Sequence, residues 1–238
     1  MAGIRSQVKE TIQRDSFDSP YLVVCEGRAD AAFFNRLFRE RNIGNFQIDI
    51  PLIHGRNGTT SAGNTCFGEY LKAVRTEFQL NPNSVRAIIL ATDCDTDPTE
   101  SFVKVQRQIQ NANAVEGTPK YGVPATPTIL TASENGLPGI CIVMLPGSNE
   151  AGELESLCKQ PAIESSPATN KCIDQALACA SIAETAKLRL RLSLALSNPG
   201  EPNISIGRIW EQDSLQELIP VKHGAFDPIA NFFSTFTA

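Results

Sequence analysis

Residues 21–30 read Tyr-Leu-Val-Val-Cys-Glu-Gly-Arg-Ala-Asp, and residues 87–97 read Ala-Ile-Ile-Leu-Ala-Thr-Asp-Cys-Asp-Thr-Asp. Each stretch begins with an apolar run typical of a buried β-strand and ends in carboxylates. If the two strands are parallel neighbours, their carboxyl ends lie at one edge of the sheet, where open α/β sheets usually bind ligands. Carboxylates gathered there repel one another unless a cation joins them. The sequence therefore predicts a divalent-metal site at this edge.

The rest of the chain alternates strands with helices and then becomes helical. The predicted strands are Tyr21–Cys25, Phe46–Ile53, Val85–Ala91 and Gly139–Leu145, and the predicted helices cover residues 1–19, 30–41, 67–78 and 99–114. A connection rich in Pro, Thr and Gly spans residues 116–138, and prolines interrupt the helical pattern beyond residue 150. We therefore predict an α/β domain over residues 1–160, with a mostly parallel four-stranded sheet flanked by helices. A mainly helical C-terminal extension, residues 161–238, is expected to pack on it.

Composition limits the classes of protein that fit. The 238 residues contain no apolar run long enough for a membrane span, and the polar start lacks the apolar core of a signal peptide, so we expect a cytoplasmic protein. Seven cysteines include no CxxC pair and are expected to be reduced core residues. The net charge of −5 disfavours a broad, non-specific grip on nucleic acid. Nucleic-acid chemistry would then need a local basic strip, metal ions or a partner, for which an ATPase is one hypothesis.

The three aspartates after the second apolar run can be interpreted in more than one way. On an extended backbone Asp93, Asp95 and Asp97 would share one face, with alternate residues about 6.6 Å apart. An EF-hand loop also opens D-x-D-x-D, but its sixth position would be Pro98 instead of Gly, and its twelfth would be Lys104 instead of Glu. The sequence Asp-Pro-Thr-Glu makes Asp97 a strong candidate for a helix N-cap. For Asp97 both interpretations, metal ligand and cap, remain open.

Further acids follow the first and the fourth predicted strands. Glu26 ends a buried strand beside a glycine, so its carboxylate should emerge at the sheet edge. Asp30 would lie in the first turn of a helix, where an acid is favourable in any case. The stretch Gly152-Glu153-Leu-Glu155 follows the fourth strand and emerges from the same edge. One of its carboxylates could complete a second cation site.

The order of these motifs resembles the Toprim fold, which topoisomerases, bacterial primases and the overcoming-lysogenization-defect (OLD) nucleases share. The matching motifs are strand-Glu-Gly-x-x-Asp-helix, strand-Asp-x-Asp, and a last strand followed by Gly-Glu-Leu-Glu-x-Leu-Cys. The last motif is similar to small stand-alone Toprim-like proteins of bacteria with uncharacterised function. The likeness covers residues 20–160, and it favours the OLD-like nuclease branch.

The resemblance implies roles for particular residues. It implies Glu26 as metal ligand or general acid/base, Asp93 and Asp95 as paired metal ligands, Asp30 and Glu155 as further acids, and Lys187 as a site lysine from a C-terminal helix. Between Glu153 and Glu155 we favour Glu155. Topoisomerase activity fits poorly, because it needs a nucleophilic tyrosine on a separate DNA-gripping domain, and the chain has little room for the template-binding modules of a primase.

The predicted function is metal-dependent hydrolysis of phosphodiesters. Two Mg²⁺ or Mn²⁺ ions about 4 Å apart would bind the attacking water and the leaving oxygen. Hard oxygen ligands favour these ions over zinc. The expected substrate is nucleic acid, with DNA favoured over RNA, and homodimerisation stays open. The alternative is a regulatory module that binds Mg²⁺ with a nucleotide or phosphate and cleaves nothing.

Basic and aromatic residues add a few expectations. Arg28 and Arg56 are candidates to contact a substrate phosphate. The Gly-rich loop at residues 54–63 lacks the Gly-Lys-Ser/Thr ending of a P-loop, so ATP binding there is not expected. Lys187 and Arg191 would lie on one helical face. Trp210 and the Phe-rich end of the chain are expected to pack in the core rather than stack on bases.

Overall fold

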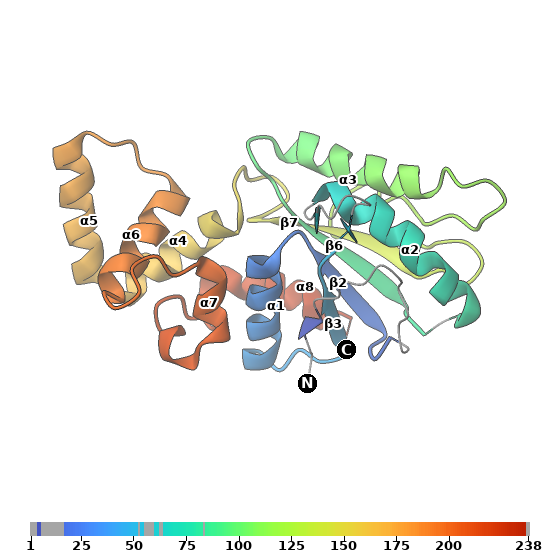
Figure 1. Ribbon diagram of the computed structural model, residues 1–238, viewed down its shortest axis with the longest axis horizontal. Coiled ribbons are helices and arrows are strands. Elements are labelled where there is room, and N and C mark those ends of the chain that lie inside the picture. The colour runs from blue at the N-terminus through green and yellow to red at the C-terminus, as the bar shows by residue number, and fades with distance from the viewer. Residues whose placement is uncertain are drawn as a thin grey trace.

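The computed structural model describes residues 4–5, 17–51, 53–54, 60–61, 64–82 and 84–236. Its main sheet has five parallel strands in the order β1-β3-β2-β6-β7 (Figure 1). The strands are β1 (Ile4–Arg5), β2 (Tyr21–Cys25), β3 (Phe46–Asp49), β6 (Ala87–Asp93) and β7 (Gly139–Leu145). The two short strands β4 (Ile53–His54) and β5 (Thr60–Ser61) pair antiparallel outside it. The predicted α/β class is confirmed, with the four predicted strands in parallel and β1 added beside β3.

Helices cover both faces of this sheet. They are α1 (Arg28–Glu40), α2 (Phe67–Leu80), α3 (Pro98–Ala112), α4 (Leu154–Ser165), α5 (Pro167–Ala180), α6 (Ala186–Ser197), α7 (Ile206–Glu211) and α8 (Asp227–Ser234), with short 3₁₀ turns η1 (Asn64–Cys66), η2 (Asp213–Leu215) and η3 (Gly224–Phe226). Figure 1 shows α2 and α3 on one face, α1 and α8 on the other, and α4–α6 extending beyond the sheet. No helix within the described ranges has the length and apolar character needed to cross a bilayer.

Strands β2, β6 and β7 are mainly apolar because both of their faces are buried. Along β6, Ile88 and Leu90 belong to the core cluster under α2 and α3, whereas Ile89 and Ala91 belong to the cluster under α1 and the C-terminal helices. This alternation follows from the period of two along a strand. All of these side chains are buried. A continuous apolar run therefore serves two cores at once, which fixes the register of the sheet.

The C-terminal segment completes the core on the α1 face. Phe33 of α1 lies with its ring centroid 5.3 Å from that of Trp210 and 5.3 Å from that of Phe226, and all three side chains are buried. A Cβ added to Gly207 in α7 would come within 3.1 Å of the Ala29 backbone, so α7 packs directly on the start of α1. The prediction that the aromatic C-terminal residues pack in the core is confirmed for Trp210, Phe226 and Phe233, whereas Phe232 and Phe236 are partly buried at its border.

The long connection between α3 and β7 runs along the outer edge of β7. It contains no helix, as predicted, and forms one isolated antiparallel bridge between Thr131 and Ile140. Thr131 exchanges backbone hydrogen bonds with Ile140, and the Thr128 N–H donates to the Ile142 carbonyl at 2.8 Å. The connection therefore satisfies backbone groups that an open edge strand would leave unpaired.

Some predicted boundaries were wrong. The second strand was expected to reach Ile53, but β3 ends at Asp49 and Ile53 belongs to β4. A helix was predicted over residues 1–19; of these, Ile4–Arg5 forms a strand, because its backbone pairs with β3, and residues 1–3 and 6–16 lie outside the described part. Five cysteines are buried as expected, whereas Cys172 and Cys179 are exposed on α5.

Candidate acidic site at the carboxyl edge of the sheet

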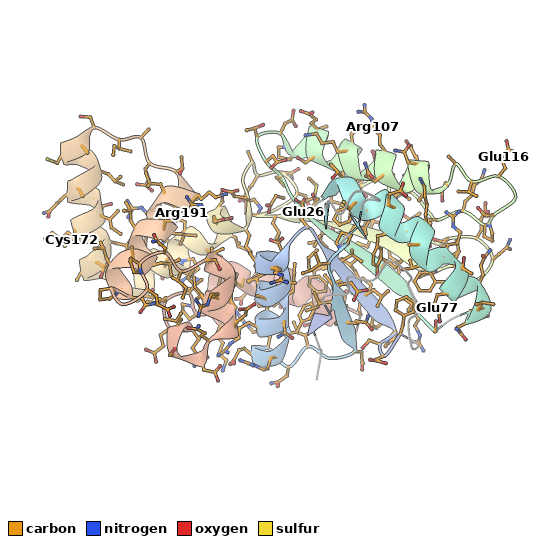
Figure 2. All side chains as sticks on the ribbon, viewed as in Figure 1. Glu26, Glu77, Arg107, Glu116, Cys172 and Arg191 are labelled. Carbon is orange, nitrogen blue, oxygen red and sulfur yellow. The ribbon has the colours of Figure 1, made fainter. Side chains whose placement is uncertain are left out.

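Glu26 lies directly after β2 and is held against the neighbouring strand β6. Its Oε1 accepts a hydrogen bond from the Thr92 hydroxyl and another from the Asp93 backbone N–H, the latter at 3.0 Å. Two donors on one carboxylate oxygen fix the orientation of the side chain. Thr92 is buried, and its part in holding Glu26 was not predicted, because a threonine in a strand carries no signal of such a role. Figure 2 shows Glu26 where the sheet meets the C-terminal helices.

Asp30 and Asp93 are strongly coupled to their acidic neighbours. Burial first, and the charges of Asp30 and Glu26 next, raise the pKa of the Asp93 carboxyl to about 8. Burial likewise raises the pKa of Asp30 to about 7, with the charge of Glu26 as the next cause. Glu155 on α4 adds a smaller charge effect on both aspartates. We call Glu26, Asp30, Asp93 and Glu155 the acidic cluster.

Backbone donors position the two aspartates. The N–H of Gly27, the N-cap residue of α1, donates to Asp30 Oδ2 at 3.0 Å. The Leu154 N–H, at the start of α4, donates to Asp93 Oδ1 at 3.0 Å. Both bonds favour the ionised carboxylate and oppose part of the rise in pKa. The first turns of α1 and α4 therefore converge on the end of β6.

Of the two glutamates at the start of α4, Glu155 is the one more closely associated with the acidic cluster. Glu155 has a side chain only 16% exposed and acts on the pKa of Asp30, Asp93 and Cys158, whereas Glu153 is the N-cap residue of α4 and 34% exposed. Lys187 lies beside both, with Nζ 3.5 Å from Glu153 Oε2 and 4.0 Å from Glu155 Oε1. The packing of α6 on α4 thus brings the predicted lysine to the rim of the acidic cluster.

Asp95 does not continue the strand, so the expectation of one extended face for the three aspartates was wrong. Strand β6 ends at Asp93, and Asp95 has a φ of 50° in the left-handed region. Its carbonyl accepts the Gly152 N–H at 2.7 Å. Gly152 itself has a φ of 140°, and a Cβ there would lie 2.5 Å from Ser156 Oγ, so only glycine fits. The exposed Asp95 is thereby pinned to the turn that carries Glu153 and Glu155.

Asp97 is the N-cap of α3. Its Oδ1 accepts the N–H of Thr99 at 2.8 Å and that of Glu100 at 3.1 Å. We expect Asp97→Ala to lower the free energy of unfolding by about 1 kcal/mol through loss of this cap, and to leave Mn²⁺ affinity unchanged. Urea unfolding and calorimetric titration with Mn²⁺ measure the two quantities. A clear loss of Mn²⁺ affinity would instead assign Asp97 to the metal site.

The two arginines predicted to contact a substrate phosphate are the remaining predicted residues. Arg28 is exposed as the first residue of α1, and Arg56 lies outside the described residues. Within the described ranges, no group of three or more His, Cys, Asp or Glu side chains is arranged to hold a metal ion. The donor set of the acidic cluster is nevertheless all carboxylate oxygen, the chemistry that Mg²⁺ and Mn²⁺ prefer.

The raised pKa values predict how metal-free stability depends on pH. Asp30 and Asp93 bind protons more tightly in the folded state than in the unfolded state, where carboxyls titrate near pH 4. The stability they confer is full below about pH 4 and is lost as the pH rises through their folded pKa values. We expect the free energy of unfolding in chelator to fall by about 2 kcal/mol between about pH 5.5 and 8.5, and Mg²⁺ to restore it. Urea unfolding at several pH values measures this; a flat profile would contradict the coupling.

Together, the parallel sheet and the carboxylates at its edge define an α/β protein with an acidic site at the carboxyl ends of β2 and β6. The chain belongs to the family described as protein of unknown function (DUF3226), whose model matches residues 20–237. That match includes the sheet strands from β2 to β7 and the C-terminal helices. No curated protein matches the chain.

Solved structures of OLD proteins are similar to this chain at low identity. The C-terminal region of the Xanthomonas campestris pv. campestris OLD protein, phased with mercury, is 16% identical with a TM-score of 0.39, covering 92% of this chain and 97% of that one. The C-terminal region of the Burkholderia pseudomallei OLD protein is 14% identical with a TM-score of 0.35, covering 92% and 89%. Scores this low support no argument about fold or activity.

Proposed function

We propose that this protein is a metal-dependent phosphodiester hydrolase that acts on nucleic acid. The observation that carries the proposal is the burial of Asp93 and Asp30 beside Glu26 and Glu155, where burial first and the neighbouring carboxylates next raise the pKa of Asp93 to about 8 and that of Asp30 to about 7. Buried aspartates whose ionised form is disfavoured by further carboxylates from neighbouring elements are typical of a site built for a cation. The sequence resemblance to Toprim nucleases points to the same reaction class.

The residues present fit Mg²⁺ or Mn²⁺ by donor type. Glu26, Asp30, Asp93 and Glu155 would hold the ions, and Asp95 could be a further ligand from its exposed turn. Bound there, the ions would supply Lewis acidity and lower the pKa of a bound water. The Gly152 N–H donates to the Asp95 carbonyl, so the segment that carries Glu153 and Glu155 lies against the segment that follows β6.

The chain's own groups account for the proton movements. In hydrolysis the water oxygen forms a bond to phosphorus, the bond from phosphorus to one sugar oxygen breaks, and the water proton passes to a base. Glu26 suits that role because Thr92 and the Asp93 N–H fix its position. Lys187 lies near Glu155 with a side chain 48% exposed, and it can neutralise charge on the phosphate or donate a proton to the leaving oxygen.

The test is cleavage by purified protein with Mn²⁺. Supercoiled plasmid, single-stranded DNA and RNA oligonucleotides are incubated with wild type and with Glu26→Gln, in the presence of Mn²⁺ or chelator. We expect cleavage by the wild type that chelator abolishes and that Glu26→Gln lowers by about a hundredfold or more. Calorimetry with Mn²⁺ runs in parallel. Metal binding without cleavage of any substrate would contradict the hydrolase and favour the non-catalytic binding module.

A further inference from the structure

A hollow of about 340 Å³ opens beside the acidic cluster, between α6 and the segment that precedes α7. We call it the α6 pocket. Its lining comes from Glu155 of α4, from Lys187, Leu190, Arg191 and Leu194 of α6, and from residues 202–206. The volume lies in the range of small-molecule sites, which begins at about 300 Å³. A ligand the size of one nucleotide fits this range, whereas a double helix does not.

The α6 pocket and the acidic cluster share a wall. Glu155 lines the pocket and also acts on the pKa of Asp30 and Asp93. Lys187 lines the pocket as well, and its Nζ lies 4.0 Å from Glu155 Oε1. A molecule seated in the pocket therefore contacts Glu155, one of the four carboxylates of the acidic cluster. This position suits a part of the substrate next to the bond that is cut.

The walls of the α6 pocket combine apolar and cationic groups. Leu190, Leu194 and Ile204 are buried and supply the apolar part. Lys187 and Arg191, one helical turn apart on α6, supply two positive charges. Such walls complement a nucleotide, which has an apolar base face and an anionic phosphate.

The charge of Arg191 is uncompensated among the described residues, in which it forms no ion pair. Arg189, two residues earlier, is in contrast buried and paired with Asp174 and Glu184, and it donates to Asn170 Oδ1 at 3.2 Å. Helix α6 thus uses one arginine to hold the C-terminal helices together and leaves the other exposed at the pocket. Figure 2 shows Arg191 within the group of C-terminal helices.

We propose that the α6 pocket holds one unpaired nucleotide of a single-stranded substrate, next to the scissile phosphate. The base lies against Leu190, Leu194 and Ile204, and Arg191 contacts a phosphate. The proposal rests on the proposed function, because the pocket shares Glu155 with the acidic cluster and is also lined by Lys187, which the proposed mechanism uses. It adds a preference for single strands, since a base can enter the pocket only when it is unstacked and unpaired.

The test measures binding separately from cleavage. Fluorescence anisotropy with labelled thymidine and uridine trinucleotides, and with a short blunt duplex, is carried out in Ca²⁺ on wild type, Arg191→Ala and Asn203→Trp. Asn203 is an exposed lining residue, so the indole fills the pocket from its rim without changing the buried core. We expect a trinucleotide to bind the wild type more tightly than the duplex, and each variant to weaken that binding about tenfold.

Matched controls are Arg107→Ala and Gln110→Trp, both at exposed positions of α3. Figure 2 shows Arg107 far from Arg191. We expect both controls to bind the trinucleotide as the wild type does, and all four variants to keep wild-type Mn²⁺ affinity. Wild-type trinucleotide affinity in both Arg191→Ala and Asn203→Trp would overturn the proposal, as would a preference for the duplex. If Asn203→Trp folds poorly by circular dichroism, Arg191→Ala decides alone. Trinucleotide binding that depends on Arg191 in a protein that cleaves nothing would contradict the hydrolase and support the pocket.

Discussion

Asp93→Asn is expected to abolish metal-dependent cleavage and, at the same time, to stabilise the metal-free protein at about pH 8. Asparagine has the same shape and keeps Oδ1 for the Leu154 N–H, which Asp93 accepts at 3.0 Å. It removes the negative charge of the carboxylate. Burial first, and the neighbouring Asp30 and Glu26 next, raise the pKa of that carboxyl to about 8. In metal-free protein that charge is a cost to folding. In the proposed mechanism it is a ligand that holds the ion.

The substitution is expected to lower the cleavage rate and to raise the free energy of unfolding of the metal-free protein. Loss of a metal-binding carboxylate should lower the cleavage rate by about a thousandfold. Removal of the repelling charge should raise the free energy of unfolding in chelator by about 1–2 kcal/mol at about pH 8, since one pKa unit corresponds to about 1.4 kcal/mol. The same substitution should flatten the dependence of metal-free stability on pH. Cleavage assays and urea unfolding in chelator provide the two measurements.

The matched control for Asp93→Asn is Glu116→Gln, at an exposed position of the connection between α3 and β7, away from Glu26 in Figure 2. It should change neither cleavage nor stability. Lower stability of Asp93→Asn at about pH 8 would show that Asp93 is not a repelled charge in the metal-free fold. Cleavage at the wild-type rate would remove Asp93 from the proposed site.

Phe33→Ala is expected to lower the free energy of unfolding by about 3–5 kcal/mol, as truncation of a fully buried phenylalanine does. Phe33 is 0% exposed, and its ring lies 5.2 Å from that of Phe34 and 5.3 Å from those of Trp210 and Phe226. It therefore joins α1 to α7 and η3. The loss should appear in one cooperative urea transition, because the C-terminal helices share their core with the sheet.

The control for Phe33→Ala is Leu80→Ala, since Leu80 at the end of α2 is 71% exposed. Its stability should stay within about 0.5 kcal/mol of the wild type. Two separate transitions in Phe33→Ala would indicate that residues 161–238 unfold as a unit of their own. A loss below about 1 kcal/mol would contradict the packing of α7 and η3 on α1.

The sheet was predictable because its signal is local. Apolar runs in β2, β6 and β7 are long, uninterrupted and followed by Gly, Pro or acids, so their existence and parallel arrangement follow from the sequence. Strand ends were less predictable, because they depend on pairing with a neighbour. β6 extends to Asp93, where its register partner is Leu145 of β7, and the apolar pattern alone does not contain that information.

The residues of the acidic cluster that directly follow or end a strand were predictable from the sequence. Glu26 and Asp93 follow from the parallel order of β2 and β6, and the structure places Asp30 and Glu155 within electrostatic reach of them. Their role as ligands stays a prediction. The turn at Asp95 was missed because its left-handed backbone depends on the distant Gly152. The α6 pocket was missed for a similar reason: it exists only where α6 and residues 202–206 pack together.

The connection that lies along β7 also affects how copies of the chain can associate. Intermolecular strand addition, the usual route by which sheet proteins aggregate, requires free backbone donors and acceptors on an outermost strand. At β7 the N–H of Ile140 and the carbonyls of Ile140 and Ile142 are already bonded to Thr128 and Thr131. A second molecule that approaches this side meets side chains of the connection instead of an open ladder. Assembly over the stretch from Ile140 to the Ile142 carbonyl must therefore depend on side-chain complementarity and not on a shared sheet.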